Sequence, residues 1–419
     1  MADVRLQRQA VTGVQNRIFQ SVPALGYYNY RLWFAGQLVS LVGTWMETTA
    51  QGFLIYQLTN SPAYLGIVGF ASGVPSLLFM LFGGVVADRI PRRTLLVITQ
   101  TTLMCFSFIV AALTFTGLVQ PWHIVILALG VGTANAFDAP ARQSFVLEMV
   151  EREHLGNAIA LNSTMFQMAT VVGPAVAGVT YAVVGPAWCF TLNGLSFIAV
   201  IVALLLMKIK PQPVKMRVSS AVEQLKEGLG YVYHHELIRT LILIAVVVSL
   251  FGLSFVTLLP AWAVGILGGD AATNGLLQSA RGLGALVAAV MIVSLGNFRA
   301  KGKLLTIGSF VFPLALIVFA FVRSIPLSLA VLVVVGWGFM VLFNMLNTLL
   351  QGIISDELRG RVMSIYTLSF FGGMPIGSLW AGAVAEHFGE PFTVILGAVI
   401  SLVFAVLIFW RIPKMRRLP

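Results

Sequence analysis

Long apolar segments recur along this chain of 419 residues and limit its fold more than any other feature. An apolar helix of about 20 residues crosses the hydrocarbon core of a bilayer, which is about 30 Å thick. Twelve segments of roughly that length or more can be placed, with short polar stretches between them. We therefore predict an all-α integral membrane protein with twelve transmembrane helices. The expected spans are 31–58, 62–87, 94–117, 121–143, 154–184, 186–208, 238–264, 272–295, 303–323, 326–352, 361–386 and 390–411.

The composition excludes whole classes of protein. Charged residues make up only 10% of the chain and hydrophobic residues 58%. A soluble domain is about 25% charged, because charged side chains cover its surface. A water-soluble enzyme of this length is thereby excluded. The chain also lacks the sequence G-x-x-x-x-G-K-[ST] that cradles nucleotide phosphates, so its energy source is expected to be an ion gradient. We expect no catalytic residues, no cofactor and no metal site.

The basic residues follow a topological pattern. The chain has 26 Lys and Arg against 15 Asp and Glu, which gives a net charge of +11. Of the 26, 24 fall on tails and loops of one side of a twelve-span arrangement; Arg323 lies on the other side and Arg281 inside a span. Cytoplasmic loops carry such an excess of positive charge. We predict that both termini are cytoplasmic in a bacterial inner membrane, where basic loops contact lipid headgroups rather than nucleic acid.

A polar stretch from Lys208 to Arg239 separates two sets of six spans. Within it, residues 221–233 have apolar side chains at helical spacing, which predicts an amphipathic helix on the membrane surface. We interpret the stretch as a linker between two bundles, although a regulatory docking role stays open. The expected organisation is a cytoplasmic tail (1–30), a first six-helix bundle (31–208), a linker (209–237), a second six-helix bundle (238–411) and a cytoplasmic tail (412–419).

Glycines recur at constant offsets between the two halves. An offset of 209 relates Gly66 to Gly275 and Gly73 to Gly282. An offset of 204 relates the next set, which pairs Gly173 with Gly377, Gly178 with Gly382 and Gly185 with Gly389. Two six-helix repeats indicate a pseudo-twofold transporter whose binding site lies between the halves.

The turn between the second and third spans reads G-V-V-A-D-R-I-P-R-R from Gly84 to Arg93. A short basic turn of this kind must stay on the cytoplasmic side. It resembles the loop signature G-x-x-x-D-[RK]-x-G-[RK]-[RK] of the major facilitator superfamily, with Pro91 in place of the usual glycine. That resemblance implies the major facilitator fold of two pseudo-symmetric six-helix bundles.

The same resemblance implies a latch that closes the cytoplasmic gate. Asp88 is expected to contact the start of the eleventh span near 361–365, and Arg92 to pair with an acid on the fourth span, for which Asp138 is the candidate. The alternative is a simple topological anchor. The expected gate residues are Gly84, Asp88, Arg89, Arg92, Arg93 and Asp138.

The fifth span carries A-T-V-V-G-P-A-V-A-G over 169–178. Small residues and a proline allow helices to approach closely and to kink. With Gly173, Pro174 and Gly178 in place, the run resembles the antiporter motif of the superfamily, which marks exporters. Ordinary helix packing is the alternative interpretation. Segments over 29–47, 58–66 and 356–365 further resemble the branch that contains enterobactin exporters and bacterial macrolide efflux proteins.

Two ionisable residues stand inside the expected spans, where a charge costs about 2.5–3.5 kcal/mol. At about 1.5 Å per residue, Glu47 lies about 20 Å and Arg281 about 16 Å from the outer ends of their spans. We hypothesise that the two face a central cavity and interact, directly or through substrate. Protonation of Glu47 then couples proton entry to export. A static buried pair is the alternative.

Polar side chains line the same helix faces. Gln51 lies one turn beyond Glu47, and Asn274 and Gln278 precede Arg281 at helical spacing. A third stripe consists of Asn344, Asn347 and Gln351. We predict that these stripes line a wet substrate cavity, with hydrogen bonds between helices as the alternative.

These features together predict a monomeric secondary transporter that exports a small amphipathic molecule, such as a drug, macrolide or siderophore, by alternating access and proton antiport. A lipid or lysolipid flippase, or a facilitator or importer of the same fold, stays open. A membrane-embedded enzyme needs convergent acid–base or metal groups, and one Glu with one Arg does not supply them. A non-transporting receptor is the remaining alternative.

Overall fold

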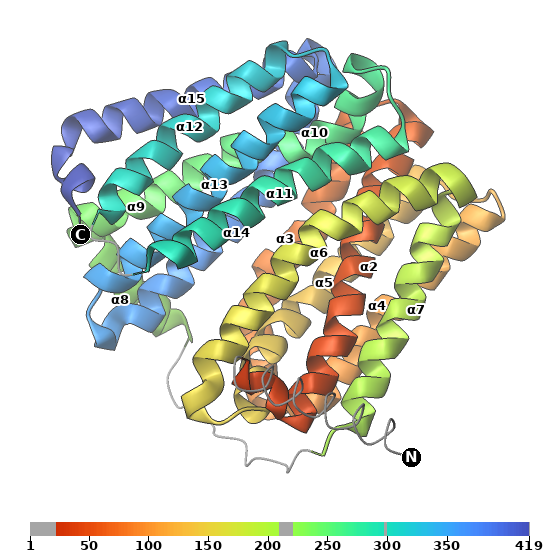
Figure 1. Ribbon diagram of the computed structural model, residues 1–419, viewed down its shortest axis with the longest axis horizontal. Coiled ribbons are helices and arrows are strands. Elements are labelled where there is room, and N and C mark those ends of the chain that lie inside the picture. The colour runs from red at the N-terminus through yellow and green to blue at the C-terminus, as the bar shows by residue number, and fades with distance from the viewer. Residues whose placement is uncertain (1–21, 209–220, 297–299, 419) are drawn as a thin grey trace, which may run out of the picture.

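The computed structural model describes residues 22–208, 221–296 and 300–418. Almost all of these residues are helical, and none of them lies in a strand. In Figure 1 the helices form two groups, one coloured red to yellow-green and the other green to blue, and most run from the lower left to the upper right. The predicted all-α architecture is confirmed for this part of the chain.

The first group is built from the first half of the sequence. Three of its helices begin at prolines, which lack the amide hydrogen that a helix start leaves unbonded. Its helices are α2 (Tyr28–Thr59), α3 (Pro62–Arg89), α4 (Arg92–Phe115), α5 (Pro121–Phe145), α6 (Leu155–Val184) and α7 (Pro186–Leu206), with the short turns η1 (Pro23–Gly26), η2 (Val146–Glu148) and η3 (Arg152–His154).

The second group follows a separate helix, α8 (Ala221–His234). Its first span is not one regular helix, because wide π-helical turns interrupt it at η4 and η5. Such turns are frequent at functional sites. The elements are α9 (Glu236–Val247), η4 (Val248–Gly252), α10 (Phe255–Ala261), η5 (Trp262–Ile266), α11 (Ala271–Leu295), α12 (Lys301–Phe321), α13 (Ile325–Ile353), α14 (Asp356–Phe388), α15 (Glu390–Arg411) and η6 (Pro413–Arg417).

Eleven helical segments among the described residues are long and apolar enough to cross a membrane. Helix α2 is not one of them, although it has 32 residues. Polar side chains such as Gln37, Glu47 and Gln51 lower its hydropathy. It nevertheless packs along α6 and α7 within the first group. Hydropathy therefore supports eleven of the twelve expected spans. The packing of α2 against α6 and α7 supports the twelfth.

The two ends of the helices differ in their turns. We name the end where the chain passes from α7 to α8 the linker side, and the opposite end the distal side. On the distal side the turns are tight, and five of them use a residue with positive φ, which glycine adopts without strain. These residues are Asn60 (50°), Gly117 (69°), Gly185 (95°), Gly268 (61°) and Gly389 (83°).

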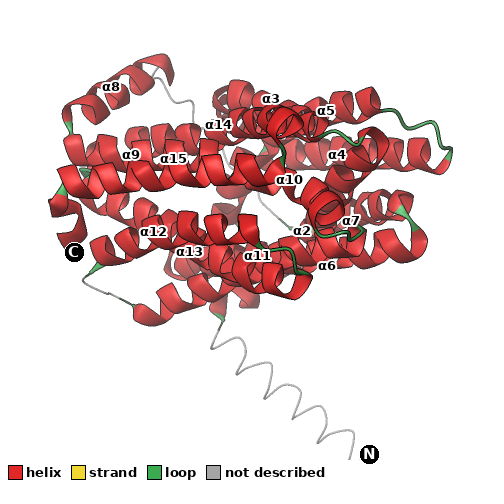
Figure 2. Ribbon diagram, turned by 90° about the horizontal axis from the view of Figure 1, so that it is seen from above, coloured by secondary structure: helices red, strands yellow, loops and turns green. Residues whose placement is uncertain are grey.

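Two helix pairs join the groups. Seen from above in Figure 2, α3 lies beside α14 at one edge of the molecule and α6 beside α11 at the other, as their packing requires. In the first pair, a Cβ on Gly66 would lie 3.0 Å from the Cα of Gly382. In the second, a Cβ on Gly275 would lie 3.0 Å from the Cα of Gly178. The repeated glycines thus meet pairwise and let the helices touch backbone to backbone.

These contacts lie in the distal halves of the four helices. Farther along the first pair, a Cβ on Gly73 would lie 2.2 Å from the ring of Pro375. In the second pair, a Cβ on Gly282 would lie 2.7 Å from the carbonyl oxygen of Thr170. The glycines that bring the two groups together therefore hold them along the distal side.

Candidate functional site

Glu47 points into the first group of helices. Its Oε2 accepts a hydrogen bond from the Ser107 hydroxyl of α4 at 2.5 Å and another from the Asn193 side-chain amide of α7. The Asn193 amide also donates to Ser107 Oγ at 3.3 Å. Both partners are buried. The carboxyl group thus lies within a polar cluster, defined here as Glu47, Ser107 and Asn193, in a group of otherwise apolar helices.

The local sequence of α2 makes room for this cluster. Gly43 lies one turn before Glu47, and a Cβ there would come within 2.5 Å of both the Asn193 side-chain oxygen and the Ser196 hydroxyl. Only a residue without a side chain allows α7 to approach α2 this closely. The glycine therefore fixes the position of Asn193, and Asn193 in turn donates to the carboxyl group.

Arg281 lies in α11 of the second group and has no such partners. Its Nε is buried and makes no hydrogen bond with any described residue. The four ion pairs formed among the described residues do not include it. The side chain as a whole is half-buried, so the guanidinium group is not sealed from its surroundings. A guanidinium in this position lacks a countercharge.

The direct ion pair expected between Glu47 and Arg281 is therefore wrong for this conformation. The two residues do lie at a similar level, since Gly173 packs on the α2 backbone at Met46 and Gly282 packs on α6 at Thr170. Glu47 is turned away because Ser107 and Asn193 offer it two donors inside its own group. The structure brings the charges to one depth without pairing them.

The polar residues beside Arg281 are also short of partners. Asn274 has no exposed surface, and neither its amide nitrogen nor its oxygen has a hydrogen-bond partner among the described residues. Gln278 is 7% exposed. Across the helix pair, the hydroxyl of Ser279 donates to the carbonyl of Val171 in α6 at 2.7 Å. Ser279 lies on the face of α11 that packs on α6, whereas Asn274 and Gln278 lie on another face of the helix.

The remaining residues predicted for the cavity lie at different places. Gln51 of α2 is half-buried. In α13, Asn344 donates to the Met340 carbonyl of its own helix at 3.0 Å, and Gln351 donates to Asn347 at 2.5 Å. The α13 stripe therefore satisfies part of its hydrogen bonding within the helix, and its role in substrate binding stays a prediction.

Gly173, Pro174 and Gly178 lie where α6 contacts two other helices. A Cβ on Gly173 would lie 2.5 Å from the Trp45 Cβ of α2. On the other side, a Cβ on Gly178 would lie 2.9 Å from the Ala272 Cα of α11. The motif therefore forms part of the contact between the two groups.

Acid–base pairs near the linker side correct the predicted gate. Arg92 pairs with Glu148 at 2.5 Å, and the pairing with Asp138 is wrong. Asp138 is fully buried and pairs with Arg142 one turn farther along α5, while Thr99 and Gln100 of α4 each donate to it at 2.8 Å. Residues four apart lie on the same face of a helix, so Arg142 is within reach of Asp138 on its own helix.

Other gate residues have separate surroundings. Arg89 is exposed, and a Cβ on Gly84 would meet nothing within 4 Å. Arg93 donates to the Leu205 carbonyl at 2.8 Å, near the end of α7, where a cation is favourable. The side chain of Asp88 lies outside the described residues, and so does its expected contact with 361–365.

The start of α14 contacts the linker helix. Arg361 forms an ion pair with Glu227 of α8. A Cβ on Gly228, the next residue, would lie 2.8 Å from the Ile365 side chain. Helix α8 is therefore attached to the second group at the segment where the contact with Asp88 was expected.

A carboxylate joins the two groups at the distal end. Glu386, near the end of α14, accepts from the Ser61 hydroxyl at 2.6 Å and from the Ala63 backbone amide at 3.1 Å. Ala63 lies in the first turn of α3, where backbone amides have no partner within the helix and the helix dipole favours a negative charge. Glu386 therefore fastens the distal end of the α3–α14 pair.

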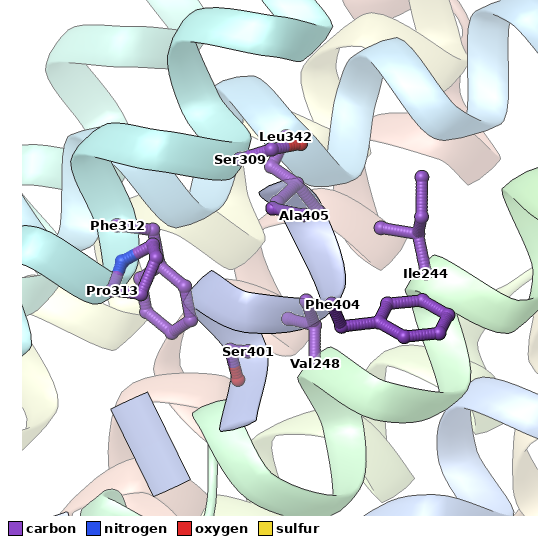
Figure 3. A pocket seen from close by; sticks show the side chains of 9 residues that line it. All are labelled: Ile244, Val248, Ser309, Phe312, Pro313, Leu342, Ser401, Phe404 and Ala405. Atoms are coloured by element: carbon purple, nitrogen blue, oxygen red, sulfur yellow. The ribbon is translucent and has the colours of Figure 1, made fainter. Parts of the chain in front are cut away.

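Two cavities differ in size and lining. One, of about 370 Å³, lies on the distal side between α2, α6 and the segment before α11, and Phe53, Tyr56, Tyr181 and Asp270 are among its lining residues. The other has only about 10 Å³ and lies within the second group. Figure 3 shows that Phe312, Pro313 and Phe404 surround it. A void of this volume holds about one water molecule, so it is no substrate site.

Comparison with known proteins identifies the family. The profile of the transmembrane secretion effector family matches residues 25–418, which is nearly the whole chain. The chain belongs to this family of the major facilitator superfamily. The predicted membership of the major facilitator superfamily is thereby confirmed, whereas the roles expected of the loop and fifth-span motifs stay predictions.

Individual relatives of this chain are transporters. The staphyloferrin A transporter of Staphylococcus aureus is 24% identical over 397 residues, which cover 93% of this chain and 97% of that protein. The enterobactin exporter of Shigella flexneri is 24% identical, with 93% and 92% covered. The solved nucleoside transporter NupG has the same fold, with a TM-score of 0.72 at 14% identity and 92% and 99% covered. The chain is accordingly a multi-pass membrane transporter for small molecules.

Several functional candidates in this chain were not found from the sequence. Ser107 and Asn193 each stand as an isolated polar residue in an apolar span, and only the packing of α4 and α7 on α2 brings them to Glu47. Glu386 stands near a helix end and gives no signal of a contact with α3. An isolated amide within an apolar span, as at Asn193, is the one signal that could have suggested a partner for Glu47.

Proposed function

We propose that this protein exports a small amphipathic molecule of the drug, macrolide or siderophore-like class across the bacterial inner membrane by proton antiport. The observation that carries the proposal is the position of the contacts between the two groups. The close glycine contacts lie in the distal halves of α3, α14, α6 and α11, which supports entry of substrate to the central faces from the linker side. The name of the enterobactin exporter among the relatives supports export as the direction.

The charge distribution supports the assignment of sides. The linker side carries the basic loops, as at Arg92 and Arg93, and basic loops are typical of the cytoplasm. Cytoplasmic substrate then enters from the linker side. Opening of the distal contacts, with closure near Arg92 and Asp138, then releases substrate outward, as alternating access requires.

Glu47 is the proposed proton carrier. A carboxyl group between Ser107 and Asn193 can exist with or without a proton, because the hydroxyl can reverse its hydrogen bond and the amide can donate to either form. An intramembrane acid with only neutral partners is the arrangement expected of a proton site. The static ion pair with Arg281, the alternative for this residue, has no support in its contacts.

Everted membrane vesicles test the proposal directly. Respiration acidifies their interior, and the fluorescence of an aminoacridine dye reports the pH difference. Enterobactin and erythromycin are added separately as probes. Wild-type vesicles are expected to take up at least one of them and to lose part of the pH difference, while Glu47→Gln vesicles take up the probe without proton release or do not take it up.

The exposed acid Glu357 provides the matched control. Glu357→Gln removes a carboxylate from the start of α14 and should leave coupling unchanged. Uptake into right-side-out vesicles instead of everted ones would identify an importer. Uptake that leaves the pH difference intact in the wild type would contradict proton antiport, and movement of labelled lysolipid alone would identify a flippase.

A further inference from the structure

The charge of half-buried Arg281 has no countercharge in its own group of helices. Every Asp and Glu between α9 and α15 stands at or near a helix end. These residues are Glu236, Asp270, Asp356, Glu357, Glu386 and Glu390. The middle of the second group therefore offers no acid that could reach Arg281.

The acids of the first group are already engaged where they face the protein interior. Glu47, the only one at the depth of Arg281, accepts from Ser107 and Asn193. Asp138 is held by Arg142, and Glu148 by Arg92. No described acid is left over to neutralise the guanidinium.

Helix geometry places Arg281 on an inward face. Exposed apolar side chains mark the lipid-facing side of α11, and Leu283, at 45% exposure, is one of them. At about 100° per residue, Asn274, Gln278 and Arg281 lie about 140–180° around the helix from Leu283. Their face therefore turns toward the centre of the molecule, between α6 and α13, both of which pack on α11.

An unpaired guanidinium inside a protein is unfavourable unless something supplies charge and acceptors. Nε of Arg281 is buried without a partner, and the amide of fully buried Asn274, two turns away, also lacks one. A planar guanidinium fork binds carboxylate, phosphate and sulfonate groups through two parallel hydrogen bonds. The missing partner is therefore an anion that arrives from outside the chain.

We propose that Arg281 binds the anionic group of an acidic substrate, so that the transported molecules are amphipathic acids. This narrows the proposed function to acidic, siderophore-like molecules and rests on it, since it takes the central face of α11 as the substrate path. When substrate is absent, Arg281 is left without a countercharge. The apolar body of the substrate lies against the neighbouring apolar surfaces, and its acid group determines selection against neutral or cationic analogues.

A matched pair of fluorescent probes tests charge selection. 1-Anilinonaphthalene-8-sulfonate and N-phenyl-1-naphthylamine share the same aromatic body, but only the first carries a sulfonate. Binding is titrated to protein in phosphatidylcholine nanodiscs, with empty nanodiscs subtracted. Arg281→Gln is expected to weaken binding of the sulfonate probe about tenfold, as loss of a charged hydrogen-bond pair implies, and to change binding of the neutral probe less than about twofold.

Two further variants keep the test specific. Arg281→Lys retains the charge without the fork and should recover part of the affinity. Arg323→Gln removes a positive charge from an exposed position of the same group and should change neither titration. Equal loss of both probes in Arg281→Gln, or equal loss in Arg323→Gln, would overturn the proposal.

The source of the anion is tested by changing the lipid. The titrations are repeated in nanodiscs that contain phosphatidylglycerol. If the difference between the wild type and Arg281→Gln persists, a dissolved acid is the ligand, as proposed. If it disappears, a lipid headgroup occupies Arg281 and the proposal is wrong. Because binding is measured without a gradient, a failure of proton antiport leaves these results unaffected.

Discussion

Glu47 and Arg281 occupy similar depths in opposite halves of the molecule, yet their surroundings differ completely. The acid is enclosed by donors from α4 and α7 of its own group. The base lies on the face of α11 between α6 and α13 and has no acceptor among the described residues. A charge within a membrane span can therefore be satisfied internally or left for a ligand, and the two cases call for different roles.

Removal of the Glu47 side chain should have the largest effect on stability. Glu47→Ala leaves Ser107 and Asn193 buried with unused donors, and each orphaned group costs about 1–3 kcal/mol. We expect a loss of about 2–4 kcal/mol in the free energy of unfolding, measured by denaturant titration in micelles. Glu47→Gln keeps an oxygen acceptor and should lose less than about 1 kcal/mol. Equal stability of the Ala variant and the wild type would mean that the cluster does not form.

Asp138 is a second satisfied acid and tests whether its partner is correctly assigned. Asp138→Asn removes the charge that faces Arg142 and should cost about 1–3 kcal/mol. In double-mutant cycles, Asp138→Asn and Arg142→Gln should show a coupling energy of about 1 kcal/mol, whereas Asp138→Asn and Arg92→Gln should be additive within about 0.5 kcal/mol. Strong coupling to Arg92 would restore the pairing first expected from the sequence.

Replacement of Arg281 should change stability in the opposite direction. Arg281→Met keeps an apolar side chain of similar length and removes a charge that has no described partner, and such replacements are often stabilising. We expect a gain of about 1 kcal/mol for substrate-free protein, measured as a higher midpoint of thermal unfolding. A lower midpoint would show that Arg281 has a structural partner, and the contrast with Glu47 would then fail.

Glu386→Gln should have the smallest effect on stability and a clear one on conformation. It weakens the charged hydrogen bonds to Ser61 and Ala63, which lie at the exposed distal end. A loss of about 0.5–1 kcal/mol corresponds to a roughly two- to fivefold rise in the distally open population. Spin-label distances between positions 117 and 324 measure that population in a background without Cys105 and Cys189. If the distally open population does not rise in Glu386→Gln, the glycine contacts alone hold the two groups together on the distal side.

Much of the fold was predictable because it depends on local pattern. Apolar length set the spans, and three helices begin at the expected residues, which are Pro62, Pro121 and Pro186. The two offsets that relate glycines of the halves indicated the repeat, but not that Gly66 meets Gly382 and Gly275 meets Gly178. The π-helical turns of the second group were not predicted, because an apolar run does not reveal how its hydrogen bonds are arranged.

The sequence by itself determined the class of protein, the family, and the two residues whose charge stands inside the spans. Hydropathy, glycine spacing and loop charge are one-dimensional properties, so they can be read without coordinates. Only the tertiary structure decided that Glu47 meets Ser107 and Asn193, that Asp138 meets Arg142, and that Arg281 meets no acid among the residues it describes. Which side chains contact each other depends on how helices far apart in the chain are rotated about their axes. A rotation of half a turn moves a side chain to the opposite side of its helix.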